Sequence, residues 1–191
     1  MSRHLQPRAG ETLVDVGGYP WCWPPGATPC AITLLNREFP SADATSAGRC
    51  KQVVGDGCAL PFADKSFDVL FSNSVIEHVG TWERQQDFAR ESRRVGRRLW
   101  VQTPAREFFI EPHLIAPAIH WLPQKWQRRL MRNFTVRGWL ERPGPREVEE
   151  FLNEVRLVTF SEMQSLFPDC TIMRERFLGL TKSYIAVRTA S

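Results

Sequence analysis

The stretch ETLVDVGGYPWCW, residues 11–23, joins a short strand to a glycine turn and sets the beginning of the fold. Residues 12–16 are mostly apolar and predict a buried strand. Gly17 and Gly18 follow at once, and glycine lets the backbone turn sharply beneath a ligand. A dinucleotide-binding turn has a third glycine close to the pyrophosphate, whereas a tyrosine, a proline and a tryptophan follow here. The turn therefore predicts a ligand site that is not the usual dinucleotide one.

Further short apolar segments recur along the chain and alternate with helical patterns. The expected strands are residues 12–16, 31–35, 52–55, 67–72, 98–102, 171–178 and 183–188. Such alternation is typical of a parallel sheet flanked by helices. The sequence therefore favours the α/β class.

Two segments carry helix signals. Residues 82–95, WERQQDFARESRRV, place apolar side chains near helical spacing among charged ones, which predicts an amphipathic helix. Gly96 is expected to end this helix. Ser161 precedes a second, shorter helical segment and is expected to cap its first turn.

Length and charge limit the classes of protein to consider. The chain has 191 residues, which fits a single domain spanning residues 1–191. Its net charge is +4, and its arginines cluster around residues 90–98 and 125–142. Such clusters either contact nucleic acid, an anionic membrane or an acidic substrate, or form solvated helix faces. Nucleic acid is the least expected of these partners, because only the arginines favour it.

The cysteines indicate the redox environment. They are Cys22, Cys30, Cys50, Cys58 and Cys170. Their number is odd, no pair has Cys-x-x-Cys spacing and no signal peptide precedes them, so we expect a reduced, cytoplasmic protein. Their spacing does not match a zinc site, and we expect no metal. No apolar run approaches the roughly 20 residues that a membrane-spanning helix needs.

The stretch VGDGCALPFADKSFDVLFSNSVIEHV, residues 54–79, resembles a motif of class I S-adenosylmethionine-dependent methyltransferases, especially their type 11 group. The motif runs Asp-x-x-x-Leu-Pro-Phe-x-Asp-x-x-Phe-Asp-x-Val. It is matched here by Asp56, Leu60, Pro61, Phe62, Asp64, Phe67 and Asp68. The resemblance extends over roughly residues 11–103 and 155–188 and leaves out residues 104–146.

This resemblance implies a fold, a cofactor and a reaction. The fold is a Rossmann-like, doubly wound sheet of about seven strands, mostly parallel with an antiparallel last strand, and with helices on both faces. The cofactor is S-adenosylmethionine, which becomes S-adenosylhomocysteine; it has no pyrophosphate, so a third glycine is unnecessary. The reaction moves a methyl group to an O, N or C atom of a small or amphiphilic molecule. The alternative is a non-catalytic protein that binds this cofactor, or a partner subunit.

The resemblance assigns cofactor contacts to the ends of the first two strands. Asp15 matches an acidic residue that organises the loop near the methionine moiety, and Gly17 and Gly18 admit the amino-acid half of the cofactor. At the end of the second strand the family has an acid that binds both ribose hydroxyls, but this chain has Asn36. Glu38 lies two residues further and points the same way in an extended chain, so it could supply the missing acid.

Further contacts follow the third and fourth strands. Asp56 matches the carboxylate that accepts a hydrogen bond from the adenine amino group, with the backbone of Gly57 and Cys58 beside the ring. Ser72 and Asn73 stand where family members pass their backbone along the cofactor. The chain then reads SNSV rather than Asn-Pro-Pro-Tyr, the pattern of enzymes that act on nucleobase amines or protein glutamine. A small-molecule acceptor is therefore favoured.

Histidine and aromatic side chains are candidates for the acceptor side of the site. His78 lies over the pocket in the matching segment and is either a base that faces the substrate or a structural residue. His113 and His120 are further candidates. Tyr19 and Trp21 either wall the sulfonium, whose charge an aromatic face attracts, or pack against the segment that follows them.

Residues 104–146 form an insertion after the fifth strand, rich in Pro, Trp, Arg and His. Few residues precede the first strand to shield the cofactor from water, so we expect this insertion to be a substrate lid or an interface. The alternative is an appendage packed on the edge of the sheet. Its residues 113–139 suit an amphiphilic or anionic acceptor, peripheral docking on a membrane surface, or a homodimer interface. The sequence does not choose among these.

Overall fold

The computed structural model describes residues 5–24, 26–39, 50–108 and 155–189, with several short pieces between the last two ranges. These pieces are residues 110–111, 116–117, 122, 125–126, 128–130, 144 and 146–149. Most of the 104–146 insertion, including His113 and His120, lies outside the described residues.

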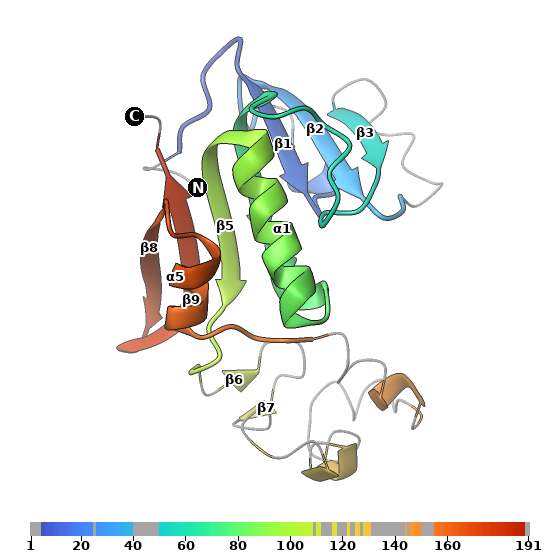
Figure 1. Cartoon of the computed structure of the whole chain (residues 1–191), viewed down its shortest axis with the longest axis vertical. Coiled ribbons are helices and arrows are strands. Elements are labelled where there is room, and N and C mark those ends of the chain that lie inside the picture. Colours follow the sequence, from blue (N-terminus) through green and yellow to red (C-terminus); the bar gives the residue numbers. More distant parts are fainter. Residues whose placement is uncertain are drawn as a thin grey trace.

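A seven-stranded sheet forms the centre of the molecule, in the order β3-β2-β1-β4-β5-β9-β8 (Figure 1). Its strands are β1 (Thr12–Val16), β2 (Ala31–Asn36), β3 (Cys50–Val54), β4 (Phe67–Asn73), β5 (Gly96–Pro104), β8 (Thr171–Phe177) and β9 (Leu180–Arg188). The strands β1 to β5 run parallel, and β9 is antiparallel to both β5 and β8. The predicted sheet, with its antiparallel last strand, is confirmed. A separate pair, β6 (Ile110–Glu111) and β7 (Ala116–Pro117), lies beyond the end of β5.

The order of the strands reverses beside β1. From β1 the chain adds β2 and β3 on one side and then returns to place β4 and β5 on the other. Asp15 accordingly pairs with Leu34 on one side and with Phe71 on the other. In open sheets of this kind a ligand binds at the carboxyl ends of the strands, beside such a reversal. The topology therefore directs attention to the residues that follow Val16.

The helix α1 (Trp82–Val95) has the predicted bounds and covers one face of the sheet (Figure 1). Phe88 and Ala89 are fully buried in a core that also includes Val14, Val16, Leu70, Leu99, Val101 and Ala186. Gly96 ends the helix, as predicted, and starts β5. A Cβ there would lie 2.7 Å from Leu70 Cβ and 2.8 Å from Leu99 Cδ2, so this close approach of helix end and sheet needs a glycine.

The opposite face of the sheet has its own core of buried residues: Leu13, Leu34, Val69, Trp100, Ile185 and Val187. Leu5 and Trp23 pack on this second core. The second helix, α5 (Phe160–Leu166), joins α1 on the first face through Met163 and Leu166. Within the described ranges, therefore, the expected helices are seen on one face, and non-helical residues pack on the other.

The cap of α5 differs from the prediction. Ser161 lies inside the helix, and Thr159 is the N-cap. The Thr159 hydroxyl accepts a hydrogen bond from the Glu162 amide at 3.3 Å, and the Glu162 carboxylate accepts one from the Thr159 amide at 2.8 Å. This reciprocal pair is a capping box, which satisfies two backbone donors where a serine cap would satisfy one. The Thr-x-x-Glu spacing of residues 159–162 is the sequence pattern that predicts this cap.

None of the described helices combines the length and the apolar character that crossing a membrane requires. None of the five cysteines forms a disulfide; all five lie in the described residues. In the described part of the chain, no three His, Cys, Asp or Glu side chains are grouped so as to hold a metal ion.

We expect Thr159→Ala to lower the free energy of unfolding by about 1 kcal/mol, because it removes the cap oxygen from the first turn of α5. Ser161→Ala is the matched control and should change it by less than about 0.5 kcal/mol. Urea unfolding of the three proteins measures both effects. A larger loss for the Ser161 variant would contradict the capping assignment.

Candidate functional site

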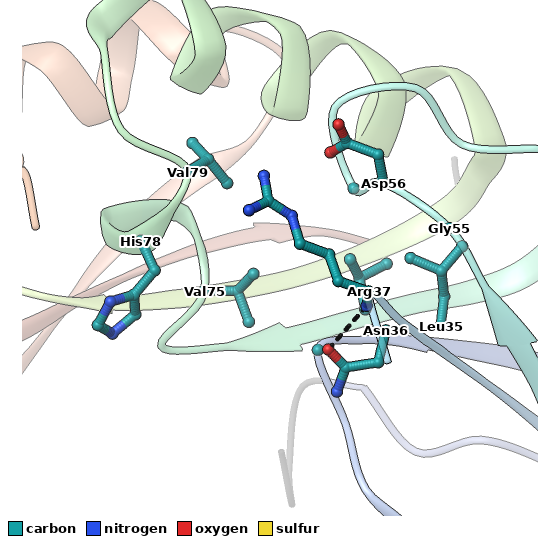
Figure 2. A pocket seen from close by; sticks show the side chains of 11 residues that line it. Leu35, Asn36, Arg37, Gly55, Asp56, Val75, His78 and Val79 are labelled. Atoms are coloured by element: carbon teal, nitrogen blue, oxygen red, sulfur yellow. Dashed lines mark hydrogen bonds between the residues drawn. The ribbon is translucent and has the colours of Figure 1, made fainter. Parts of the chain in front are cut away.

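A pocket of about 190 Å³ opens at the carboxyl ends of β1, β2 and β3 (Figure 2). Its lining residues are Val16, Gly17, Leu35, Asn36, Arg37, Gly55, Asp56, Gly57, Val75, His78 and Val79. Four elements meet here: the ends of these three strands and the short 3-10 helix η3 (Ile76–His78). The site therefore lies where the strand order predicts it.

Two of the predicted glycines are held in place by close packing. Gly17 has a φ of +87°, and a Cβ on it would lie 2.3 Å from Val75 Cγ2. Its amide donates to the Leu35 carbonyl oxygen at 2.8 Å, which ties the turn to β2. A Cβ on Gly57 would meet the Phe88 ring at 3.0 Å. Both backbones therefore line the pocket without side chains, as a ligand that lies flat against them requires.

Asp15 lies beneath the turn and not in the pocket wall. It is 2% exposed, and its carboxylate accepts a hydrogen bond from Trp23 Nε1 at 2.7 Å. A Cβ on Gly18 would lie 1.9 Å from the same carboxylate, so Gly18 is required for the turn to close over it. Burial raises the pKa of Asp15 to about 6, although the bond from Trp23 opposes this. Asp15 and Gly18 thus shape the loop from below.

Asn36 is the residue at the end of β2 that lines the pocket, whereas Glu38 is exposed and is not among the lining residues. Asn36 Oδ1 accepts a hydrogen bond from the Arg37 amide at 3.0 Å. Its Nδ2 is buried and has no hydrogen-bond partner within the described ranges. A buried donor without a partner is costly, so this amide group is suited to a ligand oxygen. Of the two alternatives for the ribose, the geometry favours Asn36.

Arg37 was missed in the sequence. Its side chain extends across the pocket between Asp56 and Val79 (Figure 2). No described carboxylate forms an ion pair with its guanidinium, and the side chain is exposed. The chain reads LLNRE at this point, so an arginine directly after the expected ribose residue was the available signal. Arg37 gives this part of the pocket a positive charge.

Asp56 faces the same pocket from the loop after β3. Its Oδ1 accepts a hydrogen bond from the Cys58 amide at 2.9 Å, and its Oδ2 pairs with Arg84 Nη2 at 2.6 Å. Burial raises the pKa of Asp56, but the bonds from Arg84 and Cys58 outweigh it and hold that pKa below its ordinary value. A carboxylate has about four acceptor positions, so Asp56 keeps capacity for an amino group of a ligand.

Three other predicted contacts are not brought into the pocket. Cys58 directs its amide to Asp56, and burial raises the pKa of its thiol to about 11, which keeps the thiol neutral. Ser72 is buried and donates to the Val16 carbonyl oxygen at 3.0 Å, where it ties β4 to β1. Asn73 is exposed at the end of β4, where its Oδ1 lies 3.4 Å from the Ser74 hydroxyl. Their predicted contacts with a cofactor stay predictions.

His78 lies at the rim of the pocket, on η3, with its ring directed away from Asp56 (Figure 2). The segment that follows the insertion packs on the same short helix. The Arg156 amide donates to the Glu77 carbonyl oxygen at 2.8 Å, and Gln85 Nε2 donates to the Arg156 carbonyl oxygen at 2.8 Å. A backbone bond to η3 and a side-chain bond from α1 therefore fix Arg156, in the segment after the insertion, to the rim of the pocket.

Tyr19 and Trp21 pack on each other, not on the pocket. Their rings are stacked, with centroids 4.4 Å apart and an angle of 5° between planes, and Phe39 meets Tyr19 edge-on at 6.3 Å. Neither is among the residues that line the pocket. The indole that matters to the turn is Trp23, which bonds Asp15 and contacts Phe71 edge-on at 5.7 Å.

Known proteins are similar to part of this sequence and to its fold. Residues 28–98 match the family model of the methyltransferase domain, type 11 group. An uncharacterized methyltransferase of Mycolicibacterium paratuberculosis is 34% identical over 97 residues, which are 47% of this chain and 38% of the relative. A second, of Mycolicibacterium vanbaalenii, is 37% identical over 93 residues, 45% of this chain and 36% of the relative. This chain thus spans little more than a third of the length of these relatives.

Solved structures extend the likeness to the whole fold. An S-adenosylmethionine-dependent methyltransferase of Methanosarcina mazei has a TM-score of 0.55 at 14% identity, over 96% of this chain and 92% of its own. A putative methyltransferase of Haloferax volcanii, solved with the Trm112 methyltransferase activator, has a TM-score of 0.57 at 11% identity, over 97% and 84%. Residues 28–98 thus match the methyltransferase domain model and the chain has the class I, Rossmann-like fold, so the resemblance found in its sequence is confirmed.

We expect Asp15→Asn to raise the free energy of unfolding above about pH 6, by up to about 3 kcal/mol. Between the ordinary pKa of 3.8 and about 6, the unfolded chain loses this proton while the folded protein keeps it. Stability therefore falls as pH rises through that range. Asparagine never ionises and keeps an oxygen for Trp23.

Urea unfolding of both proteins between about pH 4 and pH 8 measures this difference. The gain should vanish near pH 4, where Asp15 is protonated in the folded protein. The same difference at both ends of the range would contradict the assignment of a buried, neutral-prone carboxyl group.

Proposed function

We propose that this chain is the cofactor-binding part of an S-adenosylmethionine-dependent methyltransferase that acts on a small or amphiphilic molecule, at an O, N or C atom. The observation that carries the proposal is the pocket itself. Asn36 and Asp56 face it from the ends of two neighbouring strands, and Gly17 and Gly57 bring bare backbone to its walls. Together these groups match the shape and polarity of an adenosine.

The pocket fits the nucleoside half of this cofactor. Ligand pockets commonly enclose roughly 300–1,000 Å³, and this one encloses about 190 Å³. It therefore accounts for the adenine and ribose, and the amino-acid half would lie along the open turn at Gly17, above Asp15. Val16, Leu35 and Val79 supply the apolar contacts that a base needs on its faces.

The residues of the pocket would hold and orient the cofactor, and the bound cofactor would supply an electrophilic methyl group. Asp56 would accept from the adenine amino group, and the unpartnered Asn36 Nδ2 would donate to a ribose oxygen. Arg37 lies across the same space and is exposed, so it can turn toward solvent or lie over the base, where a cation and an aromatic face attract one another. Fixing reactants in line supplies up to about 7–11 kcal/mol of the barrier.

His78 is the candidate base. It stands on the rim of the pocket, at the side away from Asp56 where an acceptor would approach (Figure 2). A base is required only if the accepting atom must lose a proton. We therefore propose that His78 faces the acceptor and takes that proton where the acceptor needs it.

A second candidate function is cofactor binding without catalysis, and one observation favours it. The ribose acid is replaced by Asn36, and Arg37 adds a positive charge to a pocket that would take a cationic methyl donor. Both changes weaken binding of the methyl donor more than binding of its neutral product. Single-turnover transfer of a labelled methyl group to amphiphilic acceptors separates the two functions, because a mere binder transfers nothing.

We expect calorimetry to detect S-adenosylhomocysteine binding, and Asp56→Ala to weaken it by roughly tenfold or more. A hydrogen bond to a carboxylate contributes about 1.5–3 kcal/mol, whereas the neutral bond of Asn36 contributes about 1 kcal/mol. Asn36→Ala should therefore weaken binding only about fivefold.

Arg84→Gln is the control for this comparison. It removes the ion pair of Asp56 but leaves its carboxylate, so most of the affinity should remain. A greater loss for Asn36→Ala than for Asp56→Ala would contradict the assignment. No heat with folded wild-type protein at millimolar ligand would overturn the proposed function.

We also propose that the 104–146 insertion covers the acceptor side of the pocket. Its first residues and the chain that returns after it meet at the carboxyl edge of the sheet, where Ala105 and Val158 form a parallel bridge and the Arg106 amide donates to the Val158 carbonyl oxygen at 3.1 Å. The returning chain then binds η3, which carries His78. This anchoring supports a role for the insertion in enclosing a small or amphiphilic acceptor, in contacting a membrane, or in meeting a second copy.

We expect deletion of residues 110–140 to leave S-adenosylhomocysteine affinity within about threefold, because Asn36 and Asp56 lie outside the insertion, and to abolish methyl transfer. Calorimetry and the labelled-methyl assay measure the two effects separately. A folded deletion protein that transfers methyl groups at the wild-type rate would rule out the lid.

A further inference from the structure

The turn between β8 and β9 exposes an unusual amount of apolar surface. Phe177 is 51% exposed, Leu178 83% and Leu180 47%. They are consecutive apart from Gly179, and they form the end of a hairpin that projects from the edge of the sheet (Figure 1). Isolated exposed leucines are ordinary, but three large apolar side chains on four residues form a patch.

The backbone makes Leu178 more unusual still. Phe177 pairs with Leu180, so the turn contains only two residues, and both have positive φ: +49° at Leu178 and +83° at Gly179. This is the pattern of a type I′ turn, whose first position strongly prefers asparagine, aspartate or glycine. A bulky residue with positive φ is a genuine outlier. Leu178 therefore stands at a turn position whose backbone conformation disfavours leucine.

Cations flank the apolar tip on both strands. Arg176 and Lys182 are exposed at the positions just inside it. No described carboxylate forms an ion pair with Arg176, and Lys182 has only a loose pair, 3.8 Å from Glu175. Apolar side chains with lysine or arginine directly behind them are complementary to an anionic lipid layer, in which headgroups lie above acyl chains.

We propose that the hairpin tip, residues 177–180, inserts into the surface of an anionic lipid layer, with Arg176 and Lys182 at the headgroups. A second copy of the chain fits less well, because a stable interface buries roughly 800 Å² on each partner and a narrow two-residue turn presents far less. The tip lies at the carboxyl edge of the sheet, since Ser183 pairs with Pro104 at the end of β5. Insertion would therefore bring the pocket edge toward the lipid surface. Lipid binding by this tip does not require methyl transfer.

Co-sedimentation with vesicles of phosphatidylcholine, with and without phosphatidylglycerol, tests the proposal. Wild-type protein should sediment with the anionic vesicles and lose most of this binding in high salt, which screens exposed charges. Leu178→Asn should weaken binding about tenfold or more, because it removes the most exposed apolar side chain. The same change suits the type I′ turn, so the unfolding midpoint should stay equal or rise.

Charge and control variants complete the test. The double variant Arg176→Gln, Lys182→Gln should weaken binding to anionic vesicles by about fivefold for each cation. Val54→Thr and Lys51→Gln remove an exposed apolar residue and an exposed cation from β3, at the far end of the sheet, and should bind as wild type does. Absence of sedimentation with anionic vesicles would overturn the proposal. A stable Leu178→Asn protein that binds anionic vesicles as wild type does would also overturn it. So would a Leu178→Asn protein in which only the oligomeric state changes.

Discussion

The buried carboxylate of Asp15 is the interaction on which the site depends. It fills the space beneath the glycine turn and leaves no room for a Cβ on Gly18. Trp23 donates to it and at the same time packs on the second face of the sheet, against Phe71. One side chain thereby joins β1, the turn and the segment after it. The fold therefore carries an ionisable group in its interior, directly beneath the turn that borders the pocket.

The pocket departs at the end of β2 from the methyltransferase pattern that the sequence resembles. Where an acid would bind the ribose, the chain offers an amide donor and an arginine. Across the pocket Asp56 is kept ionised by Arg84 and remains open to a further donor. In the proposed binding mode, the adenine end keeps its carboxylate, while the ribose end is neutral to positive. The methyl donor is cationic at its sulfur and the product is not. This charge asymmetry is therefore tested by measuring the affinity for both.

Several features that the sequence separates converge on the carboxyl edge of the sheet. The pocket opens there, the start of the 104–146 insertion is bridged there to Val158, and the β8–β9 tip projects there. Parallel strands bring their carboxyl ends to one edge, so segments that follow them are neighbours even when far apart in the chain. An acceptor arriving from a lipid surface would reach this edge first.

The sequence by itself determined the sheet, the long helix and the resemblance to methyltransferases. Strand β1 and helix α1 have the predicted bounds, because periodicity and the glycines at 17, 18 and 96 act locally. It also placed Asn36 and Asp56, because a strand end fixes which edge its next residue meets. Only the tertiary structure decided that Trp23 bonds Asp15 beneath the turn, while Tyr19 and Trp21 stack on each other. It also decided that Arg37 extends across the pocket and that Arg84 forms an ion pair with Asp56. Those contacts depend on how side chains from distant segments are directed, and residue spacing along one chain does not record that.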